Sequence, residues 1–186
     1  MGENVAPLRK IAELIKGIRI AILTTVDDQG RLRSRPMATQ ESDFEGKLWF
    51  LTYDDSPKTN EIGHERQVSV SYSNPDDQRY VSIAGRATIS HDRKLVRELW
   101  RPVLKAWFPK GHDDPNIAVI EVQAEEAEYW DSPNSAFVKV AGLVKSLATG
   151  QPYMPGDNKR VNFETGEVVD AKEQEKKRAE DRESAA

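Results

Sequence analysis

The chain of 186 residues contains no cysteine. This absence excludes disulfide bonds, thiolate catalysis and metal sites with cysteine ligands, and it fits the cytoplasmic location that we expect. The three histidines, His64, His91 and His112, are scattered and match no spacing of metal ligands. His112-Asp113-Asp114 is better explained as a solvated loop, so we expect no metal site.

Long apolar runs and a strong net charge are missing as well. The charged residues Arg9, Lys10, Glu13 and Lys16 interrupt the first 22 residues, which therefore do not read as a signal peptide. No segment is apolar for long enough to span a bilayer, so we expect no membrane contact. The net charge of -4 argues against non-specific binding of nucleic acid, which needs a basic surface.

Familiar catalytic motifs are also lacking. The sequence has no GxSxG, HExxH, P-loop or GxGxxG motif. A dinucleotide-binding fold would further need strands that alternate with helices, and this alternation is missing. Function must therefore be sought in a different pattern.

Short strands joined by turns are what the chain does have. Apolar residues recur with a period of two in several segments, which are separated by Gly, Asp, Asn and Pro clusters. Pro36 indicates an edge or a bulge in the second segment. The predicted strands cover residues 18–26, 31–39, 47–53, 68–72, 80–89, and 117–122 with 126–130. Strands of this length at close spacing predict a mainly β protein, a small antiparallel barrel with flanking helices.

Helical spacing predicts the flanking helices over 5–17, from Ser56-Pro57 onward, over 91–106 and over 134–147. In the third of these we expect a kink near Pro102 and a buried stripe of Leu95, Leu99 and Val103. We expect one domain over residues 1–150, with a core drawn mainly from residues 8–148. Residues 151–186 form a C-terminal extension, whose mixed-charge run after Val169 we expect to be solvated or disordered.

The segment Trp49–Lys58 carries the most specific chemistry. A strand ends there, the chain turns and a helix starts, so backbone N–H groups and the helix dipole favour an anion. Thr52, Ser56 and Lys58 add two hydroxyls and a cation, a set that suits a phosphate monoester. The alternative is an ordinary capped helix with a solvated lysine, and the acidic pair Asp54-Asp55 favours it.

Four stretches, taken together, resemble the FMN-binding split-barrel family that includes pyridoxamine 5′-phosphate oxidase, and its bacterial general stress protein branch in particular. They are the hairpin Ile22–Met37, the segment Phe50–Lys58, the strands Val68–Tyr72 and Tyr80–Ala87, and Glu128-Tyr129-Trp130. The loop 107–115, WFPKGHDDP, is similar to a loop of the stress-protein branch. The resemblance spans residues 8–130, and more weakly reaches 147.

This resemblance implies a split β-barrel that forms a homodimer, with one FMN at each of two interface sites. It assigns the FMN phosphate to Arg35, Ser56 and Lys58. Met37 and the strand residues Trp49, Phe50, Leu51 and Thr52 would line the flavin ring. Trp130 would approach that ring from the partner subunit, unless it is simply a core tryptophan.

Several positions depart from the oxidase. Gln40 replaces a lysine, Pro57 replaces a second basic residue and Tyr80 replaces a glutamine. The segment 131–137 lacks the Arg-x-His that grips the phosphate of the vitamin B6 substrate. Without those cations a second phosphate is held poorly, which argues against vitamin B6 oxidation.

Three functions stay open at this point. The first is an FMN-dependent oxidoreductase whose electron donor, acceptor and substrate the sequence does not name. The second is a non-catalytic flavin binder in a stress response or a redox sensor, which the scarcity of acid–base residues near the site favours. The third is a related barrel for a deazaflavin or haem, because the second basic residue is missing; the sequence does not separate FMN from FAD.

Overall fold

The computed structural model describes residues 5–40, 44–131, 157–171 and 173. The helices are α1 (Val5–Ile15), α2 (Pro57–His64), α3 (Arg93–Leu99) and the 3₁₀ segment η1 (Pro102–Ala106). The strands are β1 (Ile20–Val26), β2 (Leu32–Ala38), β3 (Lys47–Tyr53), β4 (Gln67–Asn74), β5 (Arg79–Ser90), β6 (Ile117–Asp131), β7 (Asp157–Asn162) and β8 (Val168–Asp170). This mainly β composition with flanking helices confirms the predicted fold class.

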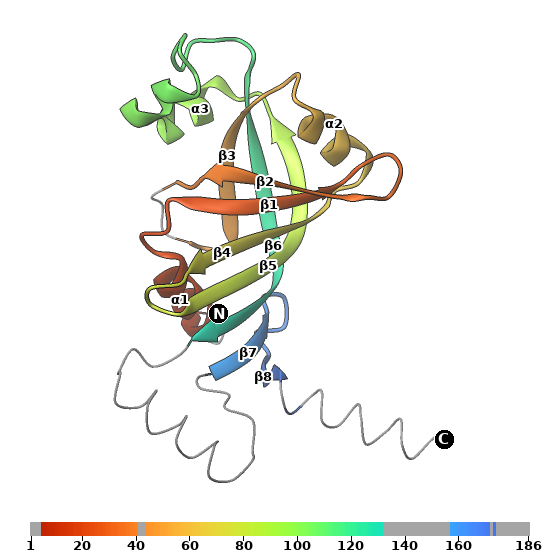
Figure 1. The fold of residues 1–186 in the computed structure, drawn as a ribbon, viewed down its shortest axis with the longest axis vertical. Coiled ribbons are helices and arrows are strands. Elements are labelled where there is room, and N and C mark those ends of the chain that lie inside the picture. The colour runs from red at the N-terminus through yellow and green to blue at the C-terminus, as the bar shows by residue number, and fades with distance from the viewer. Residues whose placement is uncertain (1–4, 41–43, 132–156, 172, 174–186) are drawn as a thin grey trace.

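One antiparallel sheet runs in the order β2-β1-β4-β5-β6-β7-β8, and β3 joins it by pairing with β6. β6 is long enough to pair with β5 along one edge, and with β3 and then β7 along the other. The sheet curls into a split barrel, with α2 and α3 toward one end and α1, β7 and β8 toward the other (Figure 1). No helix within the described residues is long and apolar enough to cross a membrane.

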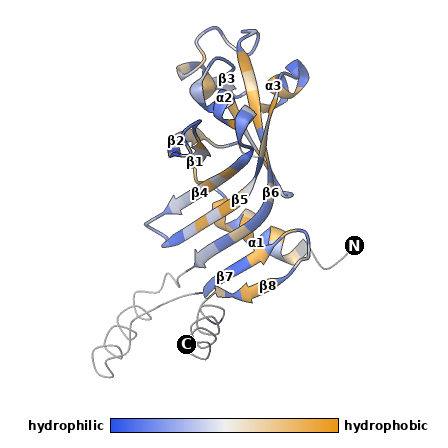
Figure 2. Cartoon of the chain, turned by 90° about the vertical axis from the view of Figure 1, so that its right-hand side faces the viewer, coloured by the Kyte–Doolittle hydropathy of each residue, from blue (hydrophilic) through white to orange (hydrophobic). Residues whose placement is uncertain are grey.

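Period-two alternation decides which side chains face inward. Val68, Val70 and Tyr72 of β4 are buried in the main core, as the spacing predicts. In the described part of α1, Ile11 and Leu14 enter the same core. The first half of β6 is buried on both faces, because Ile120 faces the barrel while Ile117 packs under α3. The hydrophobic colour of this stretch is continuous beside α3 (Figure 2).

The predicted helix over 91–106 is wrong in its second half. Pro102 has no N–H and restricts the residue before it, so Arg101 is extended, with φ −127° and ψ 144°, and a 3₁₀ turn follows. The predicted burial of Val103 is also wrong, since 67% of it is exposed. Val96 and Leu104 occupy the buried positions instead.

The C-terminal extension contains structure that the sequence did not predict. β7 pairs with β6, and Val161 enters the main core at 1% exposure. The predicted helix over 134–147, and nearly all of the charged run after Val169, lie outside the described residues. The proposed boundary at residue 150 stays a prediction, although part of the barrel core comes from beyond it.

Candidate anion site at the start of helix α2

Helix α2 begins where β3 ends, as the sequence predicts. Ser56 is its N-cap and has extended backbone angles, but its hydroxyl makes no capping hydrogen bond. That hydroxyl lies 3.2 Å from Oγ1 of Thr52 instead, on the strand side of the turn. Pro57 has no N–H, and the N–H groups of Ser56 and Thr59 donate to the carbonyl oxygens of Tyr53 and Ser56. This end of α2 therefore offers an anion two hydroxyls and the backbone N–H of Lys58.

Lys58 is the half-buried cation of this site. Among the described residues it has no hydrogen-bond or ion-pair partner. Burial lowers its pKa, the neighbouring Arg35 guanidinium lowers it further, and the Glu61 carboxylate acts in the opposite direction. An anion at the helix start would relieve that unfavourable charge.

Arg35, unlike Lys58, has side-chain hydrogen-bond partners. Its Nη2 and Nη1 donate to Oε1 and Oε2 of Glu61 at 2.7 and 2.8 Å, and Nη1 also donates to Oγ1 of Thr25 at 2.8 Å. These hydrogen bonds hold the pKa of Glu61 below its usual value. Thr25 and Glu61 escaped the sequence reasoning, because a polar residue on a predicted strand or short helix gives no indication of its tertiary partner.

The acidic pair that favoured a solvated lysine is held elsewhere. Oδ1 of Asp54 lies 2.8 Å from Nε2 of His91, and Oδ1 of Asp55 accepts from Nδ2 of Asn116 at 3.1 Å. Both carboxylates therefore have partners across the turn. These contacts orient both carboxylates, but Asp55 keeps its negative charge because the Asn116 amide is neutral.

The residues predicted to line a flavin ring divide between two environments. Met37 and Phe50 are buried in the barrel core, whereas Leu51 and Trp49 pack against the second cluster under α3. Thr52 is 3% exposed. Most of these side chains are packed inside the protein. A ligand beside β2 and β3 would therefore meet mainly backbone groups of these strands. Within the described residues β2 pairs only with β1, and β3 only with β6, so each keeps one edge of N–H and C=O groups unpaired by a strand.

Trp130 is not a core tryptophan. It lies on β6 opposite Tyr80 of β5, and each is 39% exposed on the outer face of the sheet. β2, which carries Arg35, is four strands away from β6 along the sheet. β3, which contacts β2, pairs with residues 117–123 of β6, at the opposite end of that strand from Trp130. Among the described residues, no hydrogen bond or ring contact joins Trp130 to Arg35 within one chain.

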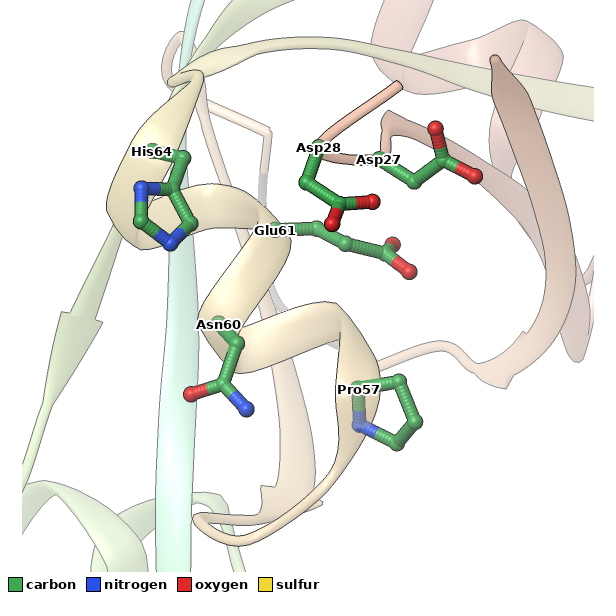
Figure 3. Close-up of a pocket in the computed structure, with 6 residues that line it drawn as sticks. All are labelled: Asp27, Asp28, Pro57, Asn60, Glu61 and His64. Carbon is green, nitrogen blue, oxygen red and sulfur yellow. The ribbon is translucent and has the colours of Figure 1, made fainter. Parts of the chain in front are cut away.

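A pocket of about 220 Å³, lined in part by Glu61, lies between α2 and the turn after β1. Figure 3 shows Asp27, Asp28 and the Glu61 carboxylate near one another there, with Pro57, Asn60 and His64 along the helix. Asp27 is already paired with Arg31 and Arg33 at 2.8 and 3.0 Å. The acidic lining disfavours a phosphate in this pocket. The described residues contain no cluster of His, Asp and Glu suited to a metal ion.

Comparison with known proteins bears on the family and the fold. The profile of the family "Pyridoxamine 5'-phosphate oxidase like" matches residues 6–154. Protein bli-3 of Neurospora crassa is 31% identical over 155 residues, which cover 78% of this chain and 74% of that protein.

Two solved structures show the same fold. The general stress protein 26 of Bacillus anthracis is 28% identical with a TM-score of 0.60, covering 67% of this chain and 94% of that one. The general stress FMN/FAD binding protein of Xanthomonas citri is 30% identical with a TM-score of 0.58, covering 69% and 89%. The barrel, the strand-to-helix turn and these matches lead to one conclusion: the chain belongs to the pyridoxamine 5′-phosphate oxidase-like family.

Proposed function

We propose that the protein is an FMN-binding flavoprotein that works as a homodimer. The observation that carries this proposal is Lys58, a half-buried cation without an ion-pair partner among the described residues, at a helix start beside two hydroxyls. A phosphate monoester supplies the missing negative charge and an acceptor for the backbone N–H of Lys58. The Xanthomonas citri relative, described as binding FMN or FAD, supports the choice of a flavin.

The flavin ring, in this proposal, lies along the free edges of β2 and β3. Unpaired backbone N–H and C=O groups suit the polar end of a flavin, while Met37 and the segment Trp49–Thr52 form the wall behind it. Bound FMN would supply hydride and electron transfer, and the protein would hold and orient it. The polar atoms of Ser56, Thr52 and Lys58 hold the phosphate end.

A second copy of the chain would cover the outer face of the sheet. Ile20, Ile22, Tyr80 and Trp130 are all at least 39% exposed on that face. Between them stand the small side chains Ser71 and Ser82, which are paired across β4 and β5 and allow close approach. A face of this kind fits an isologous two-fold interface, and it would bring Trp130 of one copy toward the flavin of the other.

Two functions are open to the flavin-loaded protein. In the first it is an oxidoreductase that reduces or oxidises a small molecule. The second is a non-catalytic flavin binder, and one observation favours it: Glu61, the carboxylate beside Lys58, is held ionised by Arg35 and Thr25 rather than poised to exchange a proton. Reduction of the flavin-loaded protein by NADH or NADPH, followed by repeated turnover with an acceptor, separates the two roles.

The proposal is tested on the purified protein by its visible spectrum and by the mass of whatever heat releases. Titrations of the ligand-free protein with FMN, FAD and riboflavin, followed by quenching of flavin fluorescence, complete the test. We expect FMN to bind most tightly. Binding of none of the three would overturn the proposal, and release of FAD alone would correct the cofactor.

A further inference from the structure

Strand β7 lies beyond the part of the chain that matches the family. The family profile covers residues 6–154, whereas β7 begins at Asp157. β7 nevertheless pairs with the end of β6 along its whole length and so extends the sheet beside Trp130 (Figure 1). It therefore brings side chains next to Trp130 to which the family resemblance assigns no role.

Asn158 of β7 lies directly opposite Trp130, and Tyr80 of β5 lies opposite Trp130 on its other side. Residues paired in this way project from the same face of a sheet, so the three side chains form one row across three strands. The row lies on the outer face, because Val161, three positions after Asn158, enters the core. Asn158 is thus the neighbour of Trp130 on the surface that we propose meets a second copy.

This pair has a hydrogen-bond acceptor and a donor that are both unpaired. Oδ1 of Asn158 is buried and has no hydrogen-bond partner. The indole Nε1–H of Trp130 takes part in no hydrogen bond among the described residues. A buried acceptor without a donor is destabilising, and such groups are rare in folded proteins.

The donor and the acceptor are close enough to meet. The β-carbons of directly opposite residues on neighbouring strands are about 5 Å apart, and the side chains of Asn and Trp together are long enough to bring the two groups into hydrogen-bond distance. The indole has room to turn, because Trp130 is 39% exposed. Turning it toward β7 would pair both groups at once.

Resting on the proposed function, we infer that Asn158 is a positioning residue for Trp130: its Oδ1 accepts a hydrogen bond from the indole in the dimer and holds the ring toward the partner's flavin. An exposed side chain that must be ordered on binding lowers affinity. A hydrogen bond that orders the indole before the flavin arrives removes part of that cost. The C-terminal extension thereby acts on the cofactor site of the other subunit.

Proton exchange with solvent, measured on the indole N–H groups of the full-length protein by NMR, tests the hydrogen bond itself. Trp130→Phe identifies the Trp130 signal by its disappearance. We expect Asn158→Leu, which removes the acceptor at similar size, to speed exchange of that proton. Lys159→Gln, a change on the opposite face of β7, is the matched control and should leave the rate unchanged. An unchanged rate in Asn158→Leu would overturn the inference.

Flavin affinity tests the positioning role. Asn158→Leu should weaken FMN and riboflavin binding alike, by about threefold to tenfold, because it affects the ring and not the phosphate. In the Trp130→Phe background the same change should alter either affinity by less than about twofold, since the two residues act through one contact. Equal losses in both backgrounds would show that Asn158 acts independently of Trp130 and would overturn the inference.

Asn158→Asp separates loss of the acceptor from a disturbance of β7, because it keeps an oxygen at the same place. It should retain the slow proton exchange and both flavin affinities, and losses as large as those of Asn158→Leu would contradict the positioning role. A parent protein that binds neither FMN nor riboflavin would overturn the proposed function, and with it the flavin role of Asn158. Proton exchange would still show whether the hydrogen bond exists.

Discussion

A β-carbon placed on Gly85 of β5 would lie 2.2 Å from the carbonyl oxygen of Gln123 in β6. The pairing of these two strands shifts by one residue between Ala84 and Gly85, and the backbones approach closely there. Only glycine fits against backbone at this distance. The close approach lets β5 and β6, the two longest strands, continue together past the shift.

We predict that Gly85→Ala destabilises the protein by about 1–3 kcal/mol or more, because the new methyl group meets backbone that cannot swing aside. Urea unfolding measures the change. Gly63→Ala in α2 is the control, since nothing lies within 4 Å of its added carbon, and it should stabilise the helix by up to about 1 kcal/mol. Equal stability of Gly85→Ala and the parent would contradict the observed strand approach.

A second prediction concerns pH. The pKa of Glu61 is held below its usual value of 4.5 by Arg35, so its ion pair contributes fully above that pH. The contribution is lost as the pH falls through the lowered folded-state pKa. Glu61→Gln should therefore cost about 1–3 kcal/mol near neutral pH, and progressively less below 4.5.

Unfolding of the parent and Glu61→Gln at several pH values measures this difference. Glu98→Gln serves as the control, because Glu98 is an exposed carboxylate 3.6 Å from Lys94 and such pairs contribute little. A difference between the parent and Glu61→Gln that stays constant from neutral to strongly acid pH would show that the carboxylate charge is not what holds α2.

Strand periodicity predicts the barrel well because its interior imposes a period of two. In β1 alternate residues face opposite sides of the sheet, and the period of two alone does not show which set is inside. Ala21 and Leu23 face the core, whereas Ile20 and Ile22 are 45% and 39% exposed. Larger apolar residues usually mark the inner face. Their position outside is understandable if that face meets another chain.

The site was predictable only where neighbours in sequence create it. Thr52, Ser56 and Lys58 lie within one strand-to-helix turn, and the sequence places them together. Arg35 and Glu61 are 26 positions apart and meet only through the packing of α2 on the barrel. β7 escaped prediction for a related reason, since Val161 is its single buried residue and offers no alternation to recognise.

The exposed isoleucines provide a third prediction. Ile22→Glu should convert a dimer to a monomer, because it places a charge in the middle of the proposed interface while leaving the core untouched. Sedimentation equilibrium at micromolar concentration measures the mass. Val103→Glu, at another exposed apolar position, should remain dimeric. A parent that is monomeric with flavin bound would contradict both the interface and the reach of Trp130 to the partner's site.

The last prediction tests Lys58 directly. Lys58→Ala should weaken FMN binding by roughly tenfold to a hundredfold, the equivalent of a charge-assisted hydrogen bond of about 1.5–3 kcal/mol. Riboflavin binding should hardly change, since riboflavin has no phosphate. Without ligand the variant should melt at the same temperature or slightly higher. The pKa of Lys58 is lowered by burial and by Arg35, so its positive charge destabilises the folded protein.

Lys105→Ala, which removes an exposed lysine on η1, is the control for general charge effects. If FMN and riboflavin weaken equally, Lys58 does not meet the phosphate; if neither weakens, it is a solvated lysine on an ordinary helix.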